Sequence, residues 1–195
     1  GPLDTSGNFV AGLATSSYTV PVNGDNNMIG GSTAADRNVM ASAGGNYGVF
    51  VNGAGASNNR ISGNYIGIDA SGSSNVGNSW TAVSLFGSGA NNVIGGSGAD
   101  QANLITGSNA APIYLANAGS GSLVQGNWIG IGANGTSIVG SSTRAIDLDT
   151  GANNVSLLDN WIAGSTSNSI YVRNAVTGTV IQGNRIGTNL DGTAN

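Results

Sequence analysis

The sequence has no lysine, glutamate, histidine or cysteine, and charged residues make up only 7% of its 195 positions. Typical soluble domains contain about 25% charged residues. Five arginines and nine acidic residues give a net charge of −4, which argues against nucleic-acid binding, because that depends on cations that neutralise phosphates. There is no run of about 18 apolar residues, so we expect no membrane-spanning segment. Apolar residues nevertheless reach 39% and recur with a period, which indicates a folded repeat rather than a disordered chain.

A short unit is repeated along the chain. Six asparagines each lie two positions before an aliphatic residue, at spacings of 24 to 39 residues. They are Asn38, Asn64, Asn103, Asn127, Asn160 and Asn184. Each unit has three short apolar stretches separated by Gly, Asn and Ser, which favour turns and positive φ. The third stretch carries aliphatic pairs at i and i+2, such as Val49/Val51 and Ile146/Leu148, and this spacing puts both side chains on one face of a strand.

Strands this short cannot bury an apolar face alone, so equivalent strands of successive units must stack about 4.8 Å apart. Three strands per unit then build three short parallel sheets around one apolar column. The predicted fold is all-β: a single-stranded right-handed parallel β-helix (solenoid) of about six to seven coils, with the hand taken from the crossover rule. We assign residues 24–195 to the β-helix repeats and expect residues 1–23 to form an irregular N-terminal coil or cap.

Both ends of the sequence look cut. Gly1-Pro2, with no initiator methionine, resembles the scar left when a protease removes an expression tag. Residues 187–195 match residues 67–75, but the earlier copy continues into another strand. We therefore interpret the chain as a fragment of a longer protein, truncated within a repeat at the C-terminus.

The row of six asparagines has a structural interpretation. A side-chain amide at a turn can donate a hydrogen bond to one neighbouring coil and accept one from the other, which satisfies buried polar groups along the stack. We therefore predict an asparagine ladder rather than a ligand site. A second, incomplete ladder is expected at the first turn from Asn27, Asn59, Asn92 and Asn154.

The repeat reads Asn-Asn-x-Ile-x-Gly-Asn-x-Ile-Gly, followed by a Gly/Asn-rich insertion and Gly-x-x-Val. This pattern resembles large bacterial right-handed β-helix repeat proteins, and the similarity covers residues 24–195. Those proteins are secreted or attached to the cell surface and many resemble adhesins, so the resemblance implies a non-enzymatic segment for adhesion or surface presentation. The lack of cysteine fits such an exported protein. The same superfold also hosts pectate lyases, polygalacturonases, phage tailspikes and autotransporter passengers, so it does not identify an activity.

Large aromatic side chains lie beside the inward aliphatic residues and should therefore point outward. The second strands of the units carry Tyr65, Trp128 and Trp161, and the third strands carry Phe50, Phe86, Tyr114 and Tyr171. We consider all seven as candidate ligand-binding residues. Three explanations remain open: the insertions at 69–81 and 132–143 fold back over the second-strand row, the aromatics form a subunit interface as in trimeric fibres, or they form a platform for sugar rings.

Asp147 and Asp149 should project from the same side of one strand, with Tyr171 and Arg173 of the next coil beside them. Two carboxylates flanked by aromatics resemble a glycosidase pair, so Asp147, Asp149 and Arg173 are the candidate catalytic residues. The competing interpretation is a solvent-exposed pair in which Asp149 and Arg173 form an ion pair. A lyase would need a base, and only Arg could serve here, whereas polygalacturonases have more Asp and a His.

No cofactor is expected, and a calcium site stays open but without support from the sequence, since the Gly-Gly-x-Gly-x-Asp repeat is absent. Asp69, Asp100 and Asp191 lie in Gly-rich loops and are interpreted as turn formers. The expected partners are a glycan or a surface protein of a host or neighbouring cell, with a homotrimer as an alternative. Three functions stay open: a secreted or cell-surface adhesion segment, a glycoside hydrolase or lyase fragment built on Asp147 and Asp149, and a trimeric tailspike-like fibre.

Overall fold

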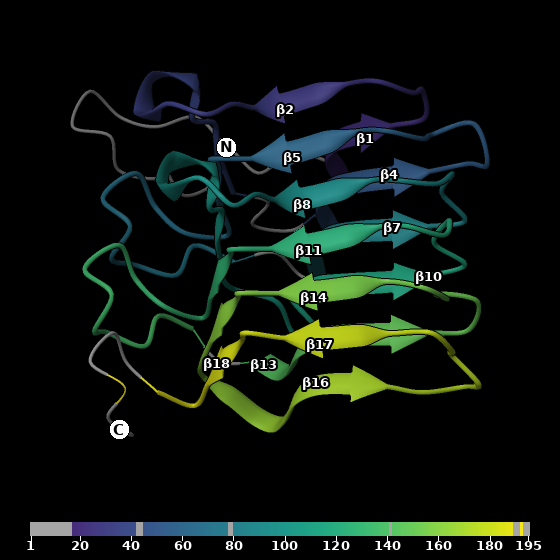
Figure 1. Ribbon diagram of the computed structural model, residues 1–195. Coiled ribbons are helices and arrows are strands. Elements are labelled where there is room, and N and C mark those ends of the chain that lie inside the picture. The colour runs from purple at the N-terminus through teal and green to yellow at the C-terminus, as the bar shows by residue number, and fades with distance from the viewer. Residues whose placement is uncertain (1–16, 42–44, 78–79, 141, 189–191, 193–195) are drawn as a thin grey trace.

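The computed structural model describes residues 17–41, 45–77, 80–140, 142–188 and 192. Over these residues the chain winds into successive coils of three strands, and equivalent strands stack into three six-stranded sheets (Figure 1). Every pairing between neighbouring strands is parallel. The parallel β-helix predicted from the sequence is therefore confirmed, with six coils.

The three sheets are named after the first, second and third strand of the repeat. The first sheet contains β2 (Met28–Gly30), β5 (Arg60–Ser62), β8 (Val93–Gly95), β11 (Leu123–Gln125), β14 (Ser156–Leu158) and β17 (Val180–Gln182). The second sheet contains β3 (Val39–Met40), β6 (Tyr65–Ile66), β9 (Leu104–Ile105), β12 (Trp128–Ile129), β15 (Trp161–Ile162) and β18 (Arg185–Ile186). The third sheet contains β1 (Tyr18–Val22), β4 (Tyr47–Asn52), β7 (Thr81–Phe86), β10 (Ile113–Ala116), β13 (Ser142–Asp149) and β16 (Ser165–Val172). Two single-turn 3-10 helices, Ala34–Asp36 and Ala99–Gln101, follow β2 and β8.

The apolar column inside the coils has the register that the sequence predicts. Ile105 pairs with Ile66 on one side and with Ile129 on the other, and all three side chains are fully buried. The equivalent residues of the last coil, Ile181 and Ile186, are 45% and 44% exposed. Ile181 and Ile186 lie on the end strands β17 and β18, so they lack the second neighbouring coil that covers Ile105.

The asparagine ladder is formed at the turns that connect strands of the first sheet to strands of the second sheet. The Nδ2 group of each ladder residue donates to Oδ1 of the next, at 2.8–3.2 Å, from Asn38 through to Asn184. The same Oδ1 atoms also accept the backbone N–H of the preceding ladder residue. Four of the six side chains are at most 1% exposed. A buried amide without hydrogen-bond partners is costly. The ladder supplies these partners and so stabilises the same turn in every coil.

The second ladder is shorter than predicted. Asn27 donates to Asn59 and Asn59 donates to Asn92, but in the next coil Ser122 takes the position and bonds its own turn instead. Asn154 is not a member, which corrects the prediction. It has a φ of 54°, like the asparagines that immediately precede the ladder positions in earlier coils, so it forms the turn itself.

One strand lies where an irregular segment was predicted. β1 falls within residues 1–23 and pairs in parallel with β4. Val20 and Val22 have the same i, i+2 spacing as the other third-sheet strands, so the signal was present in the sequence. The pairing also places Tyr18 directly opposite Tyr47, which extends the outer face of the third sheet by one aromatic row.

Insertions follow two strands of the second sheet, β6 and β12. Each forms a small loop closed by an antiparallel bridge, Ile68 with Asn75 and Ile131 with Ile138. In the first loop the Asp69 carboxylate accepts hydrogen bonds from the Ser71 hydroxyl and from two backbone N–H groups, so it acts as a turn former. The loops also contact each other through a 2.8 Å hydrogen bond from the backbone of residue 133 to that of residue 72. Asp191 lies outside the described residues.

Candidate functional site

These two loops cover part of the outward row of the second sheet. Tyr65 and Leu104 of the row form an apolar cluster with Ile68 and Val139 of the loops. Tyr65 is 8% exposed. Fold-back of the insertions is therefore the correct explanation for the N-terminal part of the row.

Farther along the row, Trp128 and Trp161 stack in register with ring centroids 5.3 Å apart in an edge-to-face arrangement. Trp161 is 6% exposed, packs with Ile131 of the second loop, and donates its indole N–H to the carbonyl oxygen of Thr188 at 3.1 Å. The sugar-platform alternative therefore fails at Tyr65 and Trp161, because a sugar ring cannot stack on an aromatic face that the protein already covers, whereas Trp128 stays partly exposed.

The outer face of the third sheet carries a different set of aromatics. Six rings are in contact there, from Tyr18, Tyr47, Phe50, Trp80, Phe86 and Tyr114. Their centroids lie 4.5–6.4 Å from those of their neighbours, the range in which aromatic pairs are favourable. We call this set the aromatic strip. It spans four coils, from β1 to β10, and Tyr18, Trp80 and Phe86 are each about two-fifths exposed.

Phe50, Phe86 and Tyr114 of the strip were predicted from the i, i+2 pattern, because they alternate with inward aliphatic residues. Tyr18, Tyr47 and Trp80 were missed. Tyr18 and Tyr47 lie two positions before the inward Val20 and Val49, so strict alternation would place them inside the coils, and no local pattern predicts their contact with the outward Phe50. Trp80 precedes β7 and enters the stack through backbone hydrogen bonds to residues 46 and 110, which no local pattern indicates.

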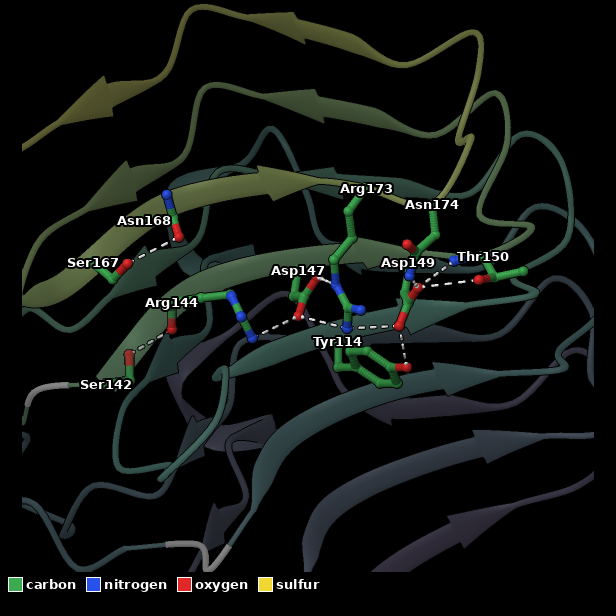
Figure 2. A network of polar contacts seen from close by, with 10 residues as sticks. All are labelled: Tyr114, Ser142, Arg144, Asp147, Asp149, Thr150, Ser167, Asn168, Arg173 and Asn174. Atoms are coloured by element: carbon green, nitrogen blue, oxygen red, sulfur yellow. Dashed lines mark hydrogen bonds and ion pairs between the residues drawn. The ribbon is translucent and has the colours of Figure 1, made fainter.

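The two carboxylates predicted as a catalytic pair lie at the C-terminal end of the same face, where Asp147 follows Tyr114 in register. They are buried, at 2% and 9% exposed, so they are not a solvent-exposed pair, but the predicted ion pair between Asp149 and Arg173 is formed. A single guanidinium lies between them (Figure 2): Arg173 Nε is 3.0 Å from Asp147 Oδ1, and Arg173 Nη2 is 2.6 Å from Asp149 Oδ2. Arg144 adds a second ion pair to Asp147 at 3.2 Å.

Asp149 has further partners. Its Oδ1 accepts from the Asn174 amide at 2.6 Å and from the Thr150 backbone N–H at 2.7 Å, and its Oδ2 accepts from the Tyr114 hydroxyl at 3.0 Å. Burial acts to raise the pKa of Asp149, but these hydrogen bonds outweigh it and lower the pKa to about 2. Burial and the bond to Asp149 raise the pKa of Tyr114 to about 12. The hydrogen bonds to Asp147 raise the pKa of Arg173.

This network leaves little capacity for acid–base chemistry. A general acid in glycoside hydrolysis must hold a proton at the working pH, whereas a pKa near 2 keeps Asp149 ionised. A nucleophile or base needs a free lone pair directed at the substrate, whereas Asp147 faces two guanidinium groups. Tyr171, predicted to lie beside Asp147, does so in register, and the Arg144 guanidinium stacks over its ring at 4.8 Å.

Tyr114 joins the aromatic strip to this network. Its ring lies 6.1 Å from that of Trp80, and its hydroxyl donates to Asp149. The outer face of the third sheet is therefore one continuous surface, aromatic over the first four coils and hydrogen-bonding over the last two. We take this surface as the candidate functional site.

Within the described ranges the structure contains no helix long and apolar enough to cross a bilayer, and the described residues include no cluster of three or more acidic side chains that could hold a metal ion. Comparisons of the chain with protein-family models, with curated proteins and with solved structures found no match. The functional argument therefore depends on the geometry of the outer face of the third sheet.

Proposed function

We propose that this chain is a non-enzymatic binding or structural segment of a large extracellular bacterial β-helix protein, secreted or held at the cell surface, that serves adhesion or surface presentation. One observation carries the proposal: a single arginine, Arg173, engages both carboxylates of the best catalytic candidate pair. The fold supports the proposal as well, since stacked coils give a rod with long, regular faces for contact with another surface.

The enzyme alternative needs Asp147 or Asp149 to exchange a proton or attack a substrate. Both uses would require the carboxylate to leave Arg173, which would place an unpaired charge in a buried site. The network is better suited to hold the surface rigid, because it joins three coils through Tyr114, the Asp pair and Arg173.

The test is an activity screen of the purified chain on pectin, alginate and a panel of neutral polysaccharides, with reducing ends and unsaturated products as the readout. We expect no product above the protein-free blank. The matched control is the Asp147→Asn/Asp149→Asn double variant. Turnover by the wild-type chain that this variant lacks would replace the proposal with a carbohydrate-active enzyme.

A further inference from the structure

Several exposed apolar side chains of the described residues belong to the ends of the stack or stand alone, but Trp80 and Phe86 do not, and Tyr18 of the end strand β1 contacts other rings of the same face. They belong to the aromatic strip, where each ring contacts at least one other ring of the strip. An exposed contiguous aromatic surface of this kind marks a contact site. Unlike the covered row of the second sheet, no described loop packs over it.

We infer that the aromatic strip binds a neutral, extended polysaccharide chain. This inference deepens the proposed function by naming the ligand class of its binding surface. The argument for a glycan uses three properties of the surface: the type of its side chains, the balance of its charge and its length along the axis of the stack.

The exposed side chains are aromatic rather than aliphatic. Flat rings present a face that packs against the C–H face of a pyranose, and the Tyr hydroxyl and Trp indole N–H add hydrogen bonds at the ring edge. The rings are also held in place by one another, with Tyr47 between Tyr18 and Trp80 at centroid distances of 5.3 and 5.2 Å. Binding therefore costs little side-chain entropy.

The surface carries no uncompensated charge. The six strip residues are Tyr, Phe and Trp, and in the adjoining network Arg144 and Arg173 balance Asp147 and Asp149. An acidic polysaccharide or an anionic membrane would need free cations, whereas hydroxyl groups need fixed donors and acceptors. Asn52, opposite Phe86 in register and partly exposed, supplies an amide of this kind at the edge of the strip.

The strip is elongated along the axis of the stack. Its rings come from four consecutive coils of one parallel sheet, whose strands are about 4.8 Å apart, although only Tyr18 and Tyr47 lie at equivalent positions of adjacent coils. An extended polymer can follow such a strip and contact its exposed rings in turn.

The experiment measures binding of cellohexaose, xylohexaose and mannohexaose to the purified chain by isothermal calorimetry and tryptophan fluorescence, with oligogalacturonate as the charged comparator. We expect at least one neutral hexaose to bind, with an affinity that does not change with ionic strength. Trp80→Ala and Phe86→Ala should each weaken binding about tenfold or more, as expected for an aromatic anchor. Trp80→Phe, which keeps a ring, should retain most of the affinity.

The matched control is Ile138→Ala, which removes an exposed apolar side chain from the second loop, outside the strip, and should leave the affinity unchanged. The inference is overturned if no neutral hexaose binds at millimolar concentration, if only oligogalacturonate binds, or if Ile138→Ala weakens binding as much as Trp80→Ala. It is also overturned if light scattering gives a multiple of 19.1 kDa that Phe86→Ala returns to the monomer, because the strip is then an interface between copies of this chain.

These outcomes separate the inference from the proposed function. If the chain neither binds nor cleaves glycans, the inferred ligand is wrong, but the proposed function as a structural or presenting segment still stands. If the chain cleaves a glycan in the activity screen and also binds a hexaose through Trp80, the non-enzymatic function is wrong, but the inference that the strip binds glycans still stands.

Discussion

Replacing Trp161 by alanine should lower the free energy of unfolding by about 3–5 kcal/mol, the range measured for large aromatic residues in protein cores. The magnitude follows from the structure. Trp161 is 6% exposed, and a buried tryptophan removes about 150–250 Å² from water, worth about 4–6 kcal/mol as an upper bound. Alanine retains part of that burial, but it also loses the hydrogen bond from the indole N–H to Thr188 and the edge contact with Trp128.

Trp80 is the matched control, since it is the same residue type on the outside of the same stack but is 43% exposed. Trp80→Ala should cost only about 1–2 kcal/mol, because water can occupy the space that the indole leaves and no enclosed cavity forms.

Thermal unfolding followed by circular dichroism distinguishes the two variants. For a chain of this size about 1 kcal/mol shifts Tm by 2–4 °C, so Trp161→Ala should lose about 6–20 °C and Trp80→Ala clearly less. The spectra below the transition should match that of the wild-type chain. Equal losses in the two variants, or an unchanged Tm for Trp161→Ala, would refute the conclusion that the loops cover the second-sheet row.

Three further changes test the core and the ion-pair network. Ile105→Ala should cost about 2–5 kcal/mol in urea unfolding, because Ile105 is fully buried. Ile181→Ala, at an equivalent position of the exposed last coil, should cost much less, and Ile105→Asp should prevent folding; a soluble Ile105→Asp protein with full strand content would contradict the register. Arg173→Ala should cost about 3 kcal/mol, since it leaves Asp147 buried without its main partner, and adding Asp147→Asn should restore part of the loss. Asp149, whose pKa of about 2 lies below the ordinary value of 3.8, stabilises the fold fully above about pH 5, and on the order of 2–3 kcal/mol should be lost as the pH falls towards 2. Asp149→Asn should flatten this part of the pH profile of the urea midpoint, and an unchanged profile would show that the carboxylate is not held in the ionised form.

The sequence alone predicted the inside of the molecule well. The inward position of Ile105 and the hydrogen bonds of Asn103 follow from a local rule, namely that an identical unit must place identical residues at the same point of each coil. Neither depends on the conformation of any insertion. For the same reason the outward direction of Phe50 and Tyr114 could be predicted before the strand bounds were known.

The exposure of the outward residues could not be predicted in this way. Trp161 and Phe86 both lie beside an inward aliphatic residue and were both predicted to point outward, and only the path of the loops leaves Trp161 6% exposed and Phe86 42% exposed. The ionic state of Asp149 likewise depends on side chains from three coils, including Tyr114 and Asn174, whose approach is set by strand twist and rotamers. The sequence therefore predicted part of the functional face, namely Phe50, Phe86, Tyr114 and the pair of Asp147 and Asp149, but it missed Tyr18, Tyr47 and Trp80 and did not predict how these residues interact.

The asparagine ladder has a consequence for how the chain folds. Successive ladder residues are separated by between 24 and 39 positions, so each new coil closes a loop of similar length. The difference in closure entropy between the shortest and the longest loop is only about 0.4 kcal/mol. No pair of coils is therefore strongly favoured as the starting point, and folding can nucleate at any adjacent pair and grow in both directions. Insertions of different lengths, such as those that cover Trp161, can thus be accommodated in single repeats with little effect on the rate at which the remaining coils are added.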